Sequence, residues 1–257
     1  MKRPLILVSN DDGVNAKGLR ELIEIVKEFG DTVVVAPEKG ESGMSHAISI
    51  KNPIRLNQVS TNGILTVYSV PGTPVDCIKL ALNQVLERKP DLVVSGINHG
   101  SNASISVIYS GTMGAAIEGC LNGIPSIGFS LTSHHPDADF SKSRKYIKQI
   151  IQKILQDGLP KGVCLNVNFP VNDEKNYKGI KVCRQTKGVW KEEYEKRVDP
   201  HKQTYYWLTG NFNNFEPEAQ DTDEWALQNN YAAVVPIQVD FTAFESLKTL
   251  KSLEDEK

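Results

Sequence analysis

The 257-residue sequence predicts an α/β fold, in which a mainly parallel, doubly wound sheet is followed by a C-terminal β-hairpin and helix extension. Two observations support this prediction. Short apolar runs, too continuous for strands that face water on one side, recur along the chain and indicate buried strands. Segments with apolar residues at helical spacing separate these runs, and this alternation is typical of a parallel sheet covered by helices.

Strands and helices alternate through the first two thirds of the chain. Buried strands are predicted at residues 4–8, 32–36, 91–95, 125–131 and 163–167. Helices are predicted at residues 16–29, 73–88, 113–121 and 142–156. Gly30 ends the first of these helices. Thr73 begins the second one as an N-cap, because Pro74 takes the first helical position and Asp76 lies in the first turn.

A hairpin interrupts this alternation at residues 54–59 and 65–70, which Thr61-Asn62-Gly63 connects. Beyond about residue 170, charged and aromatic stretches replace the apolar runs. A strand-like aromatic segment, a last strand and a closing helix are predicted at residues 204–208, 231–239 and 243–253. We therefore expect a core at residues 1–175 and an extension at residues 176–257. The aromatic segment forms an edge for self-association or packs on its own core, and both interpretations stay open.

Composition excludes several classes of function. The net charge is −2, from 29 basic and 31 acidic residues, so there is no electrostatic case for binding nucleic acid or a membrane surface. The four cysteines lie in or beside apolar stretches and form no Cys-x-x-Cys pair, which indicates buried free thiols in a reducing compartment. We find no signal peptide and no apolar stretch of membrane-spanning length, and we expect a cytoplasmic protein.

Two adjacent carboxylates, Asp11 and Asp12, follow the first buried strand. Ionised carboxylates side by side repel each other, and burial at a strand end increases that cost unless a cation lies between them. Oxygen ligands of this kind favour a hard divalent ion, Mg²⁺ or Mn²⁺. Asn10-Asp11-Asp12-Gly13 is also good turn chemistry, and this tetrapeptide alone does not separate a turn from a metal site.

Further polar residues follow other strands at the same predicted edge of the sheet. Ser42 and Asn98 supply a hydroxyl and an amide oxygen that suit a hard cation. Ser110-Gly111-Thr112 opens a helix, and the free N–H groups of a helix start favour a phosphate. Ser42 and Ser45 can instead shape their loop, and Ser110 can be a plain N-cap. The convergence of these residues on one edge favours phosphoryl chemistry.

Signatures of dinucleotide-binding proteins, Walker A nucleotide-binding proteins and serine hydrolases are missing from the sequence. There is no Gly-x-Gly-x-x-Gly after the first strand, no Walker A lysine and no Gly-x-Ser-x-Gly elbow. The two acids are adjacent, whereas phosphatases with an aspartate nucleophile use Asp-x-Asp spacing. His134 and His135 lie in a Pro/Asp loop and are interpreted as solvated.

The chain resembles the SurE (survival protein E) nucleotidase and phosphatase family. The resemblance rests on five segments in the family's order and spacing, which together cover most of the first 130 residues: Val8–Gly13, Val35–Ser49, Gly72–Cys77, Val94–Asn102 and Tyr109–Thr112. Residues 184–186 and 205–208 resemble the family's C-terminal part more loosely. Tyr109 is a departure, since a histidine is expected before Ser-Gly-Thr; a protonating role would then be empty or belong to His46 or His99.

The resemblance implies a Rossmann-like core, a hydrolase of nucleoside 5′-monophosphates, and a C-terminal arm exchanged in a homodimer or homotetramer. Activity on 3′-monophosphates and short polyphosphate is also implied. One divalent ion per subunit, Mg²⁺ or Mn²⁺, would be held by Asp11, Asp12, Ser42 and Asn98. The substrate-binding residues would be Asn10, Gly43, Ser45, Ser110, Gly111 and Thr112.

Two functions from different classes follow from these residues. The leading one is phosphomonoester hydrolysis by a metal-activated water, with Asp11 and Asp12 as catalytic residues and Asp12 orienting or deprotonating the water. Direct attack by a carboxylate stays open. The alternative is a non-catalytic, metal-dependent nucleotide sensor, which would use the same residues without turnover.

Overall fold

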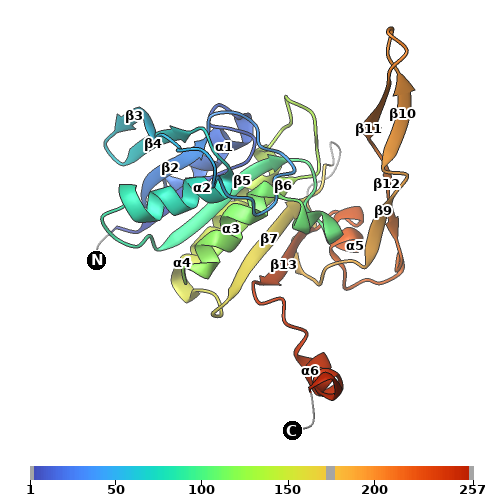
Figure 1. Cartoon of the computed structure of the whole chain (residues 1–257). Coiled ribbons are helices and arrows are strands. Elements are labelled where there is room, and N and C mark those ends of the chain that lie inside the picture. The colour runs from blue at the N-terminus through green and yellow to red at the C-terminus, as the bar shows by residue number, and fades with distance from the viewer. Residues whose placement is uncertain (1–2, 172–176, 255–257) are drawn as a thin grey trace.

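A sheet of nine strands forms the centre of the computed structural model, which describes residues 3–171 and 177–254 (Figure 1). The strand order is β3-β4-β2-β1-β5-β6-β7-β13-β8. Neighbouring strands are parallel except at two places, where β3 pairs antiparallel with β4 and β13 pairs antiparallel with β7. The strands are β1 (Leu5–Ser9), β2 (Asp31–Pro37), β3 (Asn57–Asn62), β4 (Leu65–Val70), β5 (Leu92–His99), β6 (Ser126–Leu131), β7 (Val163–Phe169), β8 (Ile180–Val182) and β13 (Ala232–Gln238).

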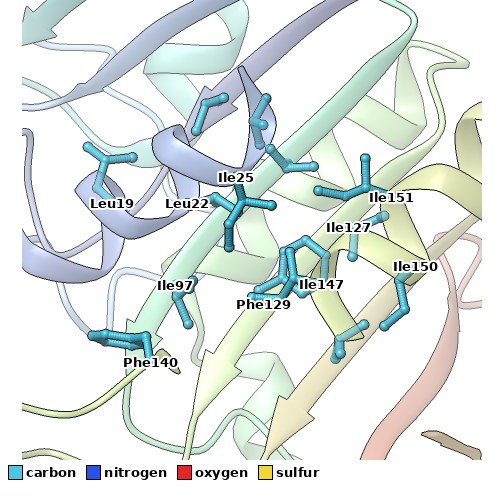
Figure 2. Packing of buried hydrophobic residues seen from close by; sticks show 14 of the residues in the cluster. Leu19, Leu22, Ile25, Ile97, Ile127, Phe129, Phe140, Ile147, Ile150 and Ile151 are labelled. Atoms are coloured by element: carbon cyan, nitrogen blue, oxygen red, sulfur yellow. The ribbon is translucent and has the colours of Figure 1, made fainter. Parts of the chain in front are cut away.

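Helices cover both faces of this sheet, which confirms the predicted doubly wound α/β fold. Successive residues of β1 point to opposite faces: Ile6 and Val8 pack with α1 (Lys17–Val26) and α4 (Ser141–Asp157). Figure 2 shows side chains of these two helices in the same cluster, among them Leu22 and Ile147. Leu7 packs on the other face with α2 (Pro74–Leu80) and α3 (Gly111–Leu121). Because both faces are covered, β1 is buried along nearly its whole length and its continuous apolar run is explained.

The helix α1 lies unusually close to β5, and a glycine makes this approach possible. A Cβ atom at Gly18 would lie 1.9 Å from the carbonyl oxygen of Ile97, so no larger residue fits there without displacing the backbone. Leu22 lies four residues after Gly18 on the same face of α1, and both Leu19 and Leu22 are fully buried in the core. This packing fixes the end of β5 against α1, next to the predicted site residue Asn98.

Several predicted element boundaries differ from the structure, among them those of three elements. The first hairpin strand is expected at residues 54–59 but is observed at Asn57–Asn62 (β3). The chain turns at Gly63, which has φ +56°, so residues 61–62 still pair with β4. The helix that begins at Thr73 has the expected capping box with Asp76, but its α-helical part ends at Leu80 and continues as a π-helical turn, η1 (Ala81–Val85). The strand β5 extends four residues further than expected, through His99.

The C-terminal part of the chain combines strands of the central sheet with a projecting hairpin arm, residues 188–214. In this arm β9 (Gly188–Lys191) pairs with β12 (Asn211–Asn214), and β10 (Tyr194–Val198) pairs with β11 (Thr204–Leu208). Figure 1 shows the arm extending away from the sheet. The predicted boundary at residues 175/176 lies outside the described residues, and the division into two domains stays a prediction.

The elements that follow the hairpin arm differ in burial. The short helix α5 (Asp223–Gln228) and β13 are largely buried, whereas α6 (Phe244–Leu250) and the following turn η3 (Lys251–Leu253) bury no residue. All four cysteines are free and buried, as predicted. Among the described residues, no helix has the length and apolar character needed to cross a membrane.

Candidate active site

The predicted site residues come together at one edge of the sheet because β2, β1 and β5 are neighbours and run parallel. Asn10, Asp11 and Asp12 follow β1 directly. The loop with Ser42 and Ser45 follows β2. Asn98 is the second-to-last residue of β5. Parallel strands present their carboxyl ends at the same edge, which is where open α/β sheets bind ligands.

Asp11 is joined to the start of α3, although 100 residues separate the two segments. The Thr112 hydroxyl donates a hydrogen bond to Asp11 Oδ1. A Cβ atom at Gly111 would lie 2.8 Å from Asp11 Cβ, so the first turn of α3 packs directly against this carboxylate. The backbone N–H of Glu41 donates to the carbonyl oxygen of Asp11 at 2.7 Å. One residue therefore links the strand, the helix start and the loop after β2.

The two carboxyl groups are held where ionisation is costly. Asp11 is 4 % exposed, and burial raises the pKa of its carboxyl group from 3.8 to about 6, with repulsion from Asp12 adding to the rise and the Thr112 hydrogen bond opposing it. Burial also raises the pKa of Asp12, against the hydrogen bond that His99 N–H donates to Asp12 Oδ2 at 3.1 Å. A cation between these groups would oppose both shifts, because it stabilises the ionised carboxylates.

The donor set around this pair fits a hard divalent cation. The Asn10 side-chain oxygen is buried without a hydrogen-bond partner, while its amide nitrogen donates to Gly13 O at 2.9 Å. The Asn98 amide nitrogen donates to Gly100 O at 2.9 Å, which fixes the orientation of this amide. Among the described residues, no group of three or more His, Cys, Asp or Glu side chains is arranged so that it could hold a metal ion. Two carboxylates supplemented by neutral oxygens and water are the pattern expected for Mg²⁺.

The serines predicted to bind phosphate take part in structural hydrogen bonds. Ser45 has φ +54°, and its hydroxyl donates to Ile108 O at 2.6 Å while its N–H donates to Tyr109 O at 3.1 Å. The Ser110 hydroxyl accepts from Met113 N–H at 3.0 Å and caps α3. Loop shaping and capping, the two alternatives for these serines, are therefore present. A further role in phosphate binding stays a prediction.

Gly43 and Ser42 occupy the open part of the loop after β2. Both are exposed, and Gly43 has φ +76° with no atom near the position of a Cβ. Ser42 and Gly43 lie beside Ser45 in the sequence, but they are not packed against the site as Ser45 is. The assignment of Ser42 to a metal and Gly43 to substrate stays a prediction.

A cavity of about 670 Å³ opens beside Ser45 and Ser110. Its wall is largely apolar and includes Ile108 and Ile117 from the segments around the start of α3. His46 also lines it, with Nε2 3.5 Å from Oε2 of Glu118, and Lys79 pairs with the other oxygen of Glu118 at 2.9 Å. Glu118 could not be predicted from the sequence, because a single acid within a helix has no local signal that distinguishes it from a surface residue.

Comparisons with known proteins agree with this geometry. A family model described as Survival protein SurE matches residues 6–192. The 5′-nucleotidase SurE of Flavobacterium psychrophilum is 54 % identical over 253 residues, which cover 98 % of each chain. The 5′-nucleotidase SurE of Bacteroides thetaiotaomicron is 55 % identical over 245 residues, 95 % of this chain and 93 % of that protein. The crystal structure of the SurE protein from Aquifex aeolicus covers 98 % of this chain with a TM-score of 0.85 and 38 % identity.

Proposed function

This chain belongs to the survival protein SurE family, and from that premise we propose that it is a 5′-nucleotidase that hydrolyses nucleoside monophosphates to nucleosides and inorganic phosphate. One observation supports this activity most directly. The buried Asp11, which is next to the half-buried Asp12, packs against the first turn of α3, so the proposed cation-binding and anion-binding groups meet at one edge of the sheet.

We infer that one divalent ion per subunit, Mg²⁺ or Mn²⁺, binds at Asp11 and Asp12, with Ser42 and Asn98 as neutral ligands. The raised pKa values of the two aspartates and the unpartnered oxygen of Asn10 support this inference. When bound, such an ion neutralises phosphate charge and lowers the pKa of water.

The start of α3 is proposed to bind the phosphate. The first N–H groups of a helix have no acceptor within the helix, and the positive end of its dipole favours a dianion. Gly111 and Thr112 supply these groups, and Ser110 holds the first turn in shape through its cap. Asn10, Gly43 and Ser45 complete the proposed substrate-binding set on the facing loops.

Asp12 is proposed to accept the proton of the attacking water. Asp11 receives the Thr112 hydroxyl and is nearly fully buried, whereas Asp12 is half-buried and is therefore the more accessible of the two carboxylates. Its raised pKa brings it closer to the neutral range in which a general base works well. The phosphorus–oxygen ester bond breaks as the water oxygen bonds to phosphorus, and the ribose oxygen leaves and takes up a proton from solvent water.

We propose a cytoplasmic homodimer or homotetramer that associates through the C-terminal extension, residues 176–257, around a catalytic core at residues 1–175. The exposed apolar residues of the hairpin arm and of α6 support this assembly, because their own chain does not cover them. They include Tyr194, Val198, Tyr206, Trp207, Leu208, Phe244, Leu247 and Leu250.

Phosphate release from a panel of 5′- and 3′-nucleoside monophosphates and short polyphosphate tests this function. We expect release from 5′-monophosphates with added Mg²⁺ or Mn²⁺, and its loss in excess EDTA with recovery on adding the metal back. Metal-dependent nucleotide binding without any phosphate release would contradict hydrolysis and support the sensor. Full activity in EDTA would contradict the metal site.

A further inference from the structure

The turn that precedes the phosphate helix is held by the C-terminal extension. This turn, η2 (Ser104–Ile108), leads through Tyr109 into the Ser110 cap of α3. It begins at Ser104, which is 1 % exposed and has φ +52°, a conformation that a residue with a side chain adopts only when its surroundings impose it. The partners of Ser104 therefore decide where the turn lies.

These partners come from residues more than 80 positions away in the sequence. Asp223 Oδ2 accepts from the N–H of Ser104 at 2.8 Å, and Thr186 O accepts from its hydroxyl at 2.8 Å. The other oxygen, Asp223 Oδ1, accepts from Thr186 N–H at 2.9 Å, from the Thr186 hydroxyl at 2.6 Å and from Glu224 N–H at 2.9 Å. Asp223 has no exposed surface, so all four bonds are shielded from water.

Two further contacts hold the same turn. From the hairpin arm, Trp190 Nε1 donates to the Ser106 hydroxyl at 3.3 Å. From the loop after β2, Ser45 donates to the carbonyl oxygen of Ile108. The turn is thus fixed between the C-terminal extension on one side and the active-site loop on the other, and the start of α3 follows from its position.

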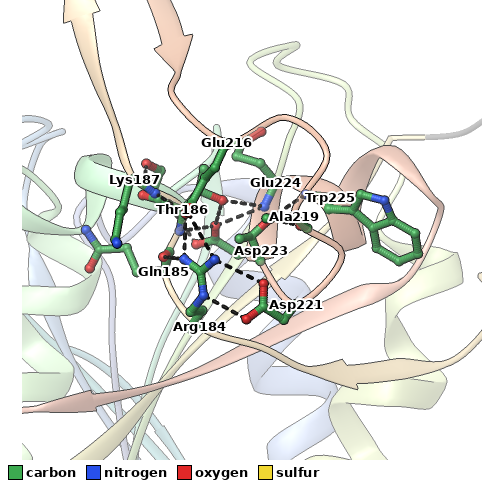
Figure 3. A network of polar contacts seen from close by, with 12 residues as sticks. Arg184, Gln185, Thr186, Lys187, Glu216, Ala219, Asp221, Asp223, Glu224 and Trp225 are labelled. Atoms are coloured by element: carbon green, nitrogen blue, oxygen red, sulfur yellow. Dashed lines mark hydrogen bonds and ion pairs between the residues drawn. The ribbon is translucent and has the colours of Figure 1, made fainter.

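A second, exposed set of charges lies next to Asp223 but does not reach the turn. Figure 3 shows Arg184 between Glu216 and Asp221, with Asp223 and Thr186 beside them. Arg184 bonds both oxygens of Asp221, at 2.8 and 3.0 Å, and both oxygens of Glu216. Asp221 thus resembles Asp223 in chemistry and place but makes none of its bonds to Ser104 or Thr186.

We propose that Asp223 is a positioning residue for phosphate binding, which holds the Ser104 turn and thereby the N–H groups at the start of α3 in the place that the phosphate requires. The inference rests on the proposed function, since it assigns the start of α3 to the phosphate. It couples the C-terminal extension to the affinity of the site for phosphate.

The substitution Asp223→Asn tests this coupling selectively. An amide nitrogen at the Oδ1 position would oppose three donors, whereas at the Oδ2 position it opposes only the N–H of Ser104. The second orientation is favoured, and it leaves the bonds to Thr186 and Glu224 intact. The variant therefore removes the acceptor of Ser104 and turns it into a donor.

We expect the KM for a nucleoside 5′-monophosphate and the inhibition constant of inorganic phosphate to rise roughly 3- to 10-fold in Asp223→Asn, because a lost bond to a buried donor costs on that scale. The kcat should change less, whereas a merely unstable protein would lose kcat and folded fraction. The matched control Asp221→Asn should leave all these constants unchanged. Wild-type constants in Asp223→Asn, or an equal rise in Asp221→Asn, would overturn the proposal.

Two further measurements decide the remaining cases. If Asp223→Asn does not fold, Ser104→Gly suits the positive φ and removes only the bond to Thr186 O; it should raise the phosphate inhibition constant about 2- to 3-fold, and an unchanged constant would overturn the proposal. Calorimetric titration of inorganic phosphate in MnCl₂ gives the affinity without turnover. A wild-type protein that binds phosphate but releases none contradicts the proposed function alone, whereas one that binds no phosphate contradicts this inference.

Discussion

The carboxyl edge of the sheet and the hairpin arm are both built from β-strands, but these strands differ in burial. At the carboxyl edge of the sheet, β1, β5 and β6 are buried along nearly their whole length. In the arm, every residue of β10 and β11 is exposed, including Tyr206 and Trp207. The strands at the carboxyl edge are covered by other parts of the same chain. The arm presents apolar surface that only a partner can cover, so substitutions in the two regions should differ in their effect on stability.

The largest expected effect on stability is at a buried aromatic of the first region. Phe129 in β6 is fully buried and stacks with Phe169 at a centroid distance of 6.4 Å. Phe129→Ala should cost about 3–5 kcal/mol of unfolding free energy, because lost burial and a residual cavity add together. Urea unfolding at low protein concentration measures it. A loss below about 1 kcal/mol would mean that this core is less tightly packed than its burial indicates.

The polar tips of the same strands should govern activity and not folding. Asp11→Asn and Asp12→Asn should each lower kcat for phosphate release roughly 100- to 1,000-fold, because each removes a negatively charged carboxylate from the proposed metal site. Asp31→Asn, at the opposite end of β2, is the control and should retain wild-type kcat. Near-wild-type turnover in both site variants would disprove the assignment of the site.

The Asp pair shows how far sequence alone reaches. A continuous apolar run followed by two acids is a local signal, and it correctly placed Asp11 and Asp12 after a buried strand beside the end of β5. The bond from Thr112 to Asp11 has no such signal, because it depends on how α3 packs across the sheet. The same holds for Asp223, whose partner Ser104 is 119 residues away. The start of β3 was misplaced because turn composition gave the hairpin's position but not the register of its strands.

A moderate effect is expected where the arm joins the sheet. Burial, and then the neighbouring Asp223, raise the pKa of Glu224 from 4.5 to about 7. Its protonated form is thus favoured in the folded protein, so the stability contribution is complete below about pH 4.5 and is lost as the pH rises through 7. Glu224→Gln should remove this pH dependence and be more stable at pH 8 by on the order of 1–2 kcal/mol.

Thermal unfolding between pH 4.5 and 8 measures the Glu224 effect, with Glu218→Gln as the control. Glu218 is exposed on the loop that precedes α5, and its substitution should leave the pH profile unchanged. Parallel profiles for the wild type and Glu224→Gln would show that Glu224 stays ionised at no cost, and that the base of the arm is more hydrated than its burial indicates.

The smallest effect on the folding of a single chain is expected in the arm itself. Trp207 is 57 % exposed, and Trp207→Ala should change the unfolding free energy at low protein concentration by less than about 1 kcal/mol. Its effect should appear in assembly instead, as a lower mass in analytical ultracentrifugation at high concentration. A loss as large as that of Phe129→Ala at low concentration would mean that the arm packs on its own chain, and would remove the contrast between the two regions.

The position of β13 gives the order of synthesis a particular importance. β8 pairs with β13 in the sheet, and β13 also covers the outer edge of β7, yet β13 is made about 50 residues after β8. While the ribosome translates the arm, β7 therefore remains an open edge that can recruit a strand from a neighbouring nascent chain. A message truncated before codon 232 would release a polypeptide in which the edge of β7 stays open. Such a polypeptide would aggregate or be degraded by quality-control proteases.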